Sequence, residues 1–521
     1  MQASWWFTAL IALSPVGLIL VAMVAFRRSA AQAGIMGLAL SLLLSLFFFG
    51  FPDLPEAPRP LVLGVAGSFA EALFVAATIL WIIFGALCIH QLQMRTGAIE
   101  TLRDGIGSLS DDPRIVAILV AWFFALFLEG AAGFGTPVAL AAPFLVGFGF
   151  KPIQAVAITL VGHSVGVSFG AVGTPIMPQI AVTSLTGPEI ARATGELHLV
   201  LGAVMLAVLL LIVTRSARAD GTPLAPVAGW FALAAAAFLL PMAAISRWVG
   251  PELPTMGGAL LGGVLFIAVL RLRRRPPSPD ATPDVVKASP TGREIFRAAA
   301  PYLIVIGLIL VTRLIGPLQA LLQSVAIEWE IRGHFKGSFQ PLYHPGTFLV
   351  LGALLGAYLQ GASRAVIGEA TRAALKMLLP VTIALVAMLA ISRLMVHAAM
   401  IDALAEAAAR TAGDLWPLLA PLVGVLGTFV TGSATASNIL FTDFQVATAH
   451  RLGFDELRLV AAQGFGAAVG NIICPHNVIA GCATVGIAGQ EGQVLRRTLG
   501  ACALYVGLGG ALVFALVALG V

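Results

Sequence analysis

The sequence predicts an all-α polytopic membrane protein with about 12 transmembrane helices plus two re-entrant hairpins in inverted-topology repeats. Three observations predict this fold class. Hydrophobic residues make up 59% of the 521 residues and charged residues only 11%, whereas soluble domains carry about 25% charged residues. Apolar runs long enough to cross a bilayer follow one another along the chain. A similar polar interruption divides an apolar run in each half of the chain.

The two interruptions predict the hairpins. The first, Leu128 to Pro137, places a carboxylate and three glycines between the apolar runs 115–127 and 138–150. Each run is shorter than the roughly 20 residues of a spanning helix, and irregular backbone at this depth must be buried in protein or line a watery cavity. We therefore expect one hairpin over 114–150 and another, around Thr431–Asn438, over 415–449.

The remaining runs predict the domain organisation. Segment 60–72 could be an interfacial helix that continues into the third span. The expected order is: 1–72 N-terminal scaffold helices; 73–214 repeat 1, with the first hairpin and a broken helix 152–185; 215–270 scaffold helices; 271–296 a cytoplasmic disordered linker; 297–375 scaffold helices; 376–521 repeat 2, with the second hairpin and a broken helix 456–486.

Charge distribution predicts the orientation. The net charge of +5 carries no message about nucleic acid, because cytoplasmic loops of membrane proteins are enriched in Lys and Arg. Placing the N-terminus outside brings the densest basic clusters, including 271–297, to the cytoplasmic side. Both termini are then periplasmic, and the two hairpins enter the membrane from opposite sides.

The two broken helices resemble each other in sequence. Residues 161–175 align with 461–475 without a gap. The glycines at 166 and 170 and the proline at 175 recur at 466, 470 and 475, and His163 falls opposite Gln463. Together with the opposite orientations, this similarity favours inverted repeats.

Helix interruptions near the membrane midplane predict a transport site, because the N-terminus of a half-helix attracts anionic groups. The half-helices are expected to begin near Thr136-Pro137 and near Asn438. The alternative is that these small residues only permit close helix packing. The expected substrate-binding residues are Gly130, Gly133, Gly135, Thr136, Ser164, Gly173, Thr174, Thr431, Gly432, Ser433, Thr435, Ser437, Asn438, Gln463, Asn471 and Asn477.

Three ionisable residues are expected to handle a coupled proton: Glu129, His163 and His476. Ionisable groups inside a span are costly and usually functional, and histidine titrates near neutral pH. Glu129 could instead support the hairpin backbone or contact substrate, and either histidine could be a packing residue.

Arg393 and His397 are four residues apart and share a helix face, so they could bind a carboxylate or take part in coupling. The alternative is an interfacial position with the charged ends in water. The chain shows no metal-ligand or catalytic-triad spacing and no nucleotide-binding loop. We therefore expect no enzyme activity, no metal and no cofactor, and an ion gradient as the energy source.

The stretches 127–138, 169–176, 431–441 and 480–497 resemble the lactate permease family of bacterial secondary transporters. The resemblance implies proton symport of lactate and related 2-hydroxymonocarboxylates such as glycolate across the inner membrane. It also implies inverted repeats that move as an elevator-like transport domain. The expected partners are a small carboxylate, H⁺ and the lipid bilayer, with a homodimer as one assembly and no nucleic acid.

The chain departs from the family pattern at both helix breaks. Gly162-His163-Ser164 stands where familiar members read roughly Ala-Asn-Thr. Gly470-Asn471 and Pro475-His476 stand where they often carry Gly-Lys and Pro-Gln. A sodium-coupled carrier of another mono- or dicarboxylate is therefore the main alternative, followed by an anion channel.

Overall fold

The computed structural model describes residues 4–26, 28–52, 60–107, 109–110, 112–133, 135–219, 226–273 and 290–520. Thirteen of its helices are long and apolar enough to cross a membrane. Two of them, Pro113–Ala131 and Met400–Thr431, contain the first arms of the predicted hairpins. The predicted fold class, an all-α polytopic membrane protein, is confirmed.

The first half of the chain contains these elements: α1 (Trp5–Val24), α2 (Ala30–Leu44), η1 (Ser45–Phe49), α3 (Pro60–Arg95), α4 (Ala98–Gly107), α5 (Pro113–Ala117), η2 (Ile118–Phe124), α6 (Ala125–Ala131), α7 (Thr136–Gly147), α8 (Pro152–His163), η3 (Ser164–Phe169), α9 (Gly170–Gly173), η4 (Thr174–Ile176), α10 (Met177–Val182), α11 (Gly187–Ala219), α12 (Ala228–Trp248) and α13 (Pro254–Arg273). Here η1 and η2 are π-helical, and η3 and η4 are 3₁₀ helices.

The second half contains these elements: α14 (Gly292–Leu314), α15 (Gly316–Gln323), β1 (Ile327–Ile331), β2 (Phe335–Phe339), α16 (Pro345–Gln360), α17 (Arg364–His397), α18 (Met400–Ala412), the 3₁₀ helix η5 (Gly413–Leu415), α19 (Trp416–Thr431), α20 (Ala434–Leu452), α21 (Glu456–Gly470), α22 (Pro475–Thr484) and α23 (Glu491–Leu519).

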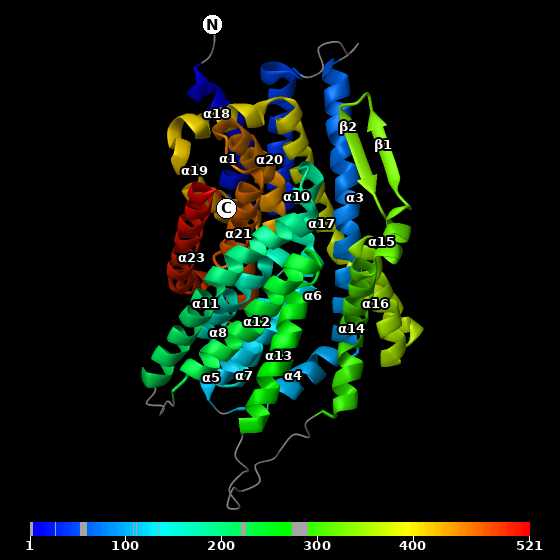
Figure 1. Cartoon of the computed structure of the whole chain (residues 1–521), viewed down its shortest axis with the longest axis vertical. Helices are drawn as coiled ribbons and strands as arrows, with labels where there is room; N and C mark the ends of the chain where they lie inside the picture. The colour runs from blue at the N-terminus through cyan, green and yellow to red at the C-terminus, as the bar shows by residue number, and fades with distance from the viewer. Residues whose placement is uncertain are drawn as a thin grey trace, which may run out of the picture.

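The two longest helices, α3 and α17, pack against each other (Figure 1). Around them the contacts occur in matching pairs. In the first pair, α2 packs on α17 and α1, and α16 likewise packs on α3 and α14. In the second pair, α18 packs on α1, and α4 likewise packs on α14. α3 is continuous from Pro60, so segment 60–72 belongs to this helix.

The two broken helices lie in the protein interior. Every residue of the most apolar stretch of 152–182 is buried, as are 89% of those in 456–484. Glycines permit this packing: a Cβ at Gly162 would clash with the Ala121 carbonyl, and one at Gly466 with the Pro421 carbonyl. Each broken helix therefore touches the backbone of a hairpin's first arm, as small residues allow in membrane helices.

Two features differ from the sequence expectations, and one expectation lies largely outside the described residues. The second half-helix was expected to begin near Asn438, but α20 begins at Ala434, because the Ser433 hydroxyl accepts a hydrogen bond from the Ala436 N–H and caps it. An antiparallel β hairpin pairs Ile327 with Phe339 through Ile331 with Phe335, and the sequence reading did not predict it. Most of the expected linker, residues 274–289, lies outside the described residues.

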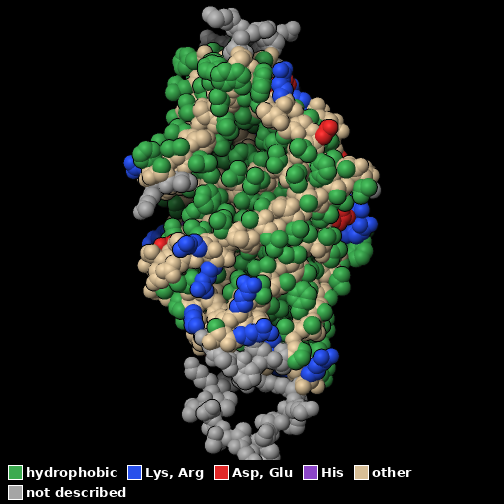
Figure 2. Space-filling model, turned by 90° about the vertical axis from the view of Figure 1, so that its left-hand side faces the viewer, with side chains coloured by type: hydrophobic (Ala, Val, Ile, Leu, Met, Phe, Trp, Pro, Cys, Tyr) green, Lys and Arg blue, Asp and Glu red, His purple; other side chains and the backbone are tan. Residues whose placement is uncertain are grey.

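The exterior suits a bilayer. Figure 2 shows a face that is mainly hydrophobic, with many Lys and Arg side chains gathered toward its lower end. Exposed leucines and other large apolar residues occur on α1, α13, α16 and α23. Such surface is stable in lipid rather than in water.

Candidate functional site

The tips of the two hairpins meet at the start of α22. Gly135 precedes α7 with a φ of +78°, and Gly432 precedes Ser433 with a φ of +79°, a left-handed conformation that favours glycine. A Cβ at Gly135 would lie 2.8 Å from Asn477 Oδ1, and one at Gly432 would lie 3.4 Å from the Cβ of His476. The first two residues after Pro475 therefore lie against both tips.

The first helix break has a strained backbone. Ala171 and Val172 adopt left-handed conformations with φ of 41° and 54°, which cost about 1–2 kcal/mol each for residues with a side chain. Gly173 follows with a φ of +78°. The Thr174 hydroxyl donates to the Ala171 carbonyl, and the Ser164 hydroxyl to the Val161 carbonyl. These two predicted substrate ligands thus bind backbone groups that the irregular helix leaves free.

Glu129 lies between the first hairpin tip and the first break. The residue is 5% exposed. There is no room for a Cβ at Gly170, because it would clash with Glu129 Oε1, and a Cβ at Gly133 would lie 3.5 Å from the same oxygen. The other oxygen, Oε2, lies 3.8 Å from His163 Nε2. The two glycines therefore make the space that the carboxyl group occupies.

The hydrogen bonds of His163 define the chemistry beside Glu129. Its Nδ1 lies 2.6 Å from the Thr159 carbonyl oxygen, which can only accept, so Nδ1 carries a hydrogen. Its Nε2 lies 3.3 Å from Asn471 Oδ1, an oxygen that also accepts from the Asn477 amide. In a neutral ring the Nε2 lone pair would face two oxygens, those of Asn471 and Glu129. A proton on His163 Nε2 removes that mismatch, whereas a proton on Glu129 removes it only on the side of the carboxyl group.

The polar residues of the second hairpin mostly satisfy one another. Gln463 Nε2 donates to Ser437 Oγ at 3.1 Å, and Ser437 Oγ donates to the Gly424 carbonyl. Asn438 Nδ2 donates to the Pro175 carbonyl at 2.8 Å. The Thr431 hydroxyl donates to the Gly427 and Ser433 carbonyls. These side chains join the second hairpin to both broken helices, so they hold the site together.

The structure thus brings together most of the predicted residues. Glu129 and Gly133 adjoin the first break. The two hairpin tips form one contiguous cluster with His163, Asn471, His476 and Asn477. Gly130 packs on the backbone of Met256 instead. Thr136 donates to the Gly133 carbonyl and is half-buried, and Thr435 is buried. His476 is exposed.

Arg393 and His397 lie elsewhere. Arg393 is paired with Asp443 of α20, and the Ser392 hydroxyl donates to the same carboxylate at 3.0 Å. His397 Nε2 lies 2.8 Å from Glu71 Oε2 of α3. Their side chains are 11% and 18% exposed. Both side chains are therefore paired with carboxylates of this chain and lie apart from the hairpin tips.

One polar chain was missed by the sequence reading. Tyr505 of α23 hydrogen-bonds His198 Nδ1 at 2.8 Å, and His198 Nε2 bonds Ser168 at 2.9 Å. The Ser168 hydroxyl donates to the Gly464 carbonyl at 3.1 Å. A neutral histidine that accepts from Tyr505 and donates to Ser168 satisfies every member. The sequence feature that could have indicated this chain of hydrogen bonds is His198, a lone histidine in the long apolar run that forms α11.

Comparison with known proteins identifies the family. Residues 8–520 match the family described as L-lactate permease. The chain belongs to this family. Its curated relatives are permeases, among them the L-lactate permease of Streptococcus iniae, 29% identical over 87% of this chain and 94% of that protein. The glycolate permease GlcA of Escherichia coli K12 is also 29% identical, over 94% of this chain and 92% of GlcA.

Solved structures share the fold of this lactate permease family member. Neisseria gonorrhoeae MtrF, described among antimetabolite efflux pumps, aligns with a TM-score of 0.50 at 15% identity over 94% of this chain and 95% of MtrF. The Alcanivorax borkumensis YdaH transporter aligns with a TM-score of 0.51 at 13% identity over 95% of this chain and 99% of YdaH. At these identities the likeness concerns the fold alone.

Proposed function

We propose that this chain imports lactate or a related small 2-hydroxymonocarboxylate, such as glycolate, by proton symport. The observation that carries the proposal is the placement of Glu129 and His163 Nε2, 3.8 Å apart and buried at the point where both helix breaks meet. A proton on His163 Nε2, beside the Glu129 carboxylate, would remove the mismatch between the His163 lone pair and its oxygen neighbours. The names of the curated relatives support lactate or glycolate as the cargo.

The carboxylate of the substrate would bind at the N-terminus of α22. This helix has ten residues and begins with Pro475, and its first free N–H groups carry partial positive charge. Exposed His476 stands beside Gly432, and half-buried Ser433 and Thr136 lie at the two tips. The substrate would thus approach Asn477 from the side of exposed His476. The proton would bind on the opposite, buried side of Asn477, where His163 and Glu129 lie.

The arrangement supports alternating access of the elevator type. The matched packing of α1–α4 and α14–α18 around α3 and α17 is what two inverted repeats would produce. The repeats would then begin with α1 and with α14, ahead of the predicted bounds 73–214 and 376–521, and α12–α13 would lie between them. In this proposal the two hairpins are re-entrant, both termini are periplasmic in the bacterial inner membrane, and the bodies that carry the breaks move against the α3–α17 pair.

Uptake by purified protein in proteoliposomes tests the proposal. An inward proton gradient should drive accumulation of labelled lactate without sodium, and unlabelled lactate or glycolate outside should drive counterflow. Accumulation that needs sodium and ignores the proton gradient would support the sodium-coupled alternative. Flux without counterflow would indicate an anion channel.

A further inference from the structure

The segment that joins α12 to α13 lies directly on the first helix break. Gly250, Pro251, Glu252 and Leu253 are all buried. A Cβ at Gly173 would lie 2.6 Å from the Pro251 carbonyl oxygen and 3.2 Å from the Cα of Glu252. The backbone of the segment is thus in van der Waals contact with the residue that follows the strained pair in the break.

The start of α13 extends this contact to the other parts of the site. The Thr255 hydroxyl donates to the Gly166 carbonyl at 2.6 Å, in the 3₁₀ stretch that precedes the break. A Cβ at Gly130, next to Glu129, would clash with the Met256 N. Residues 250–256 therefore touch the break, the 3₁₀ helix before it and the end of the hairpin's first arm.

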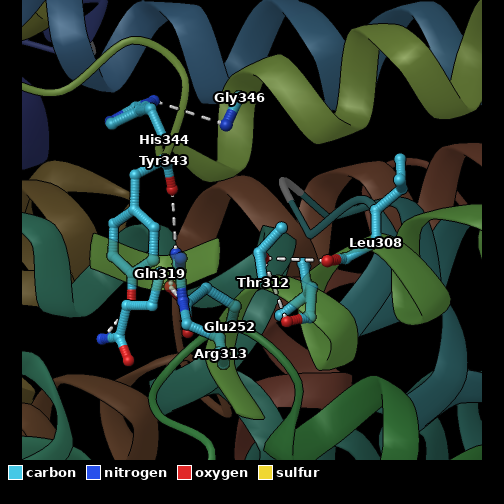
Figure 3. A network of polar contacts seen from close by, with 9 residues as sticks. Glu252, Leu308, Thr312, Arg313, Gln319, Tyr343, His344 and Gly346 are labelled. Atoms are coloured by element: carbon cyan, nitrogen blue, oxygen red, sulfur yellow. Dashed lines mark hydrogen bonds and ion pairs between the residues drawn. The ribbon is translucent and has the colours of Figure 1, made fainter. Parts of the chain in front are cut away.

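A buried ion pair holds this segment from the other side (Figure 3). Arg313 of α14 donates to Glu252 Oε1 through Nε at 3.1 Å and through Nη2 at 2.6 Å. Both side chains are 6% exposed. The guanidinium lies 3.5 Å over the ring of Tyr343, whose carbonyl also accepts from Nη2. Gln319 donates to the Tyr343 hydroxyl at 2.9 Å. This bond holds in place the ring on which the Arg313 guanidinium stacks.

The geometry of the pair favours a positioning role over a purely stabilising one. Both bonds use one oxygen, while Glu252 Oε2 and Arg313 Nη1 are buried without a hydrogen-bond partner in the described part of the chain. Burying two charges with incomplete bonding adds little net stability, so the pair is better explained by a role in fixing one arrangement of the elements it joins. α14 also touches the hairpin directly, because Tyr302 packs on Phe127 with ring centroids 4.9 Å apart.

We propose that Glu252 and Arg313 are positioning residues of the transport site: their pair presses segment 250–253 onto Gly173 and so keeps the break in the conformation that encloses Glu129. The inference rests on the proposed function. Because Gly170 of the same break lies against the Glu129 carboxyl, a shift of the segment changes both the substrate cleft and the surroundings of the proton site.

Kinetics of the full chain in proteoliposomes test the inference. Glu252→Gln should raise KM for lactate about tenfold, change Vmax less than about threefold and move the pH profile of uptake. Glu252→Asp, which keeps the charge but shortens the side chain, should raise KM by a smaller factor. Exchanging the partners in the double variant Glu252→Arg/Arg313→Glu should recover part of the lost affinity. The exposed pair Arg103–Asp104 supplies the control, Asp104→Asn, with wild-type kinetics.

Several outcomes would overturn the inference. One is a folded Glu252→Gln or Glu252→Asp protein with wild-type KM and pH profile. Another is loss of folded protein in all three Glu252 variants, which would show that the pair supports the fold as a whole. A wild-type protein that transports no lactate under any gradient would instead reject the proposed function.

Discussion

The two halves of the site share a backbone plan and differ in chemistry. Each has a hairpin with a left-handed glycine at its tip and a buried helix with a break. The first half holds the ionisable pair Glu129 and His163 and a break with left-handed Ala171 and Val172. The second half holds mainly amides and hydroxyls, with the exposed His476 after its break, and its described backbone has no positive φ between Gly453 and Gly486.

The difference suggests a division of labour. Aligned positions 163 and 463 carry a histidine and a glutamine. His163 contacts Asn471 of the second half, and Gln463 bonds Ser437 within its own half. A glutamine amide keeps one hydrogen-bonding pattern at every pH, whereas a histidine changes its pattern with its protonation state. At this aligned position the first half can therefore respond to a proton, whereas the second half cannot.

The largest expected effect comes from removing the carboxylate of the first half. Glu129→Gln should lower gradient-driven accumulation about 100-fold or more while counterflow continues, because the amide keeps the shape but cannot release a proton. Uptake and counterflow in proteoliposomes measure the two activities. Glu189→Gln, at an exposed carboxylate of the same half, serves as control. Equal loss of both activities would assign Glu129 a binding or structural role.

Making the first half resemble the second should have the next effect. His163→Gln gives position 163 the residue that the aligned position 463 carries. The variant should reduce proton-driven uptake about tenfold and flatten its pH dependence. The comparison is His198→Gln, which breaks the Tyr505–His198–Ser168 chain and should lower the melting temperature without changing the pH profile. An unchanged profile in His163→Gln would remove this histidine from coupling.

The strain in the first break predicts a difference in stability between the halves. Ala171→Gly relieves about 1–2 kcal/mol of left-handed strain, which offsets the loss of a methyl group and the added chain entropy. Ala468→Gly, in the regular helix α21, gains no such relief and should cost about 1–2 kcal/mol. Thermal unfolding in detergent should show a lower melting temperature for Ala468→Gly; the reverse order would contradict the strain argument.

The smallest expected effect concerns His344, which lies outside both breaks. It separates the acid sensitivity of folding stability from the pH dependence of transport. Burial, and then the charge of Arg313, lowers the pKa of His344 to about 4. The unfolded state therefore binds more protons between about pH 6.5 and 4, so stability falls as pH drops through that range. His344→Gln should reduce this fall, measured by melting temperature, and leave the pH profile of uptake unchanged. An altered uptake profile would place His344 in the coupling machinery.

The sequence by itself determined the fold class and the elements that hold the site. Composition and the lengths of apolar runs are sufficient for this, because a bilayer demands long apolar helices and tolerates breaks only in the interior. The breaks at 170–175 and 471–475 and the residues beside them were therefore found from local patterns alone.

Only the tertiary structure decided which side chains face one another. Asn471 reaches His163 across 308 residues, Asn438 reaches Pro175, and Glu252 meets both Gly173 and Arg313. It also showed that Arg393 and His397 are taken by Asp443 and Glu71. Periodicity reports how one element divides between core and surface, but the pairing of buried polar groups depends on how distant helices pack.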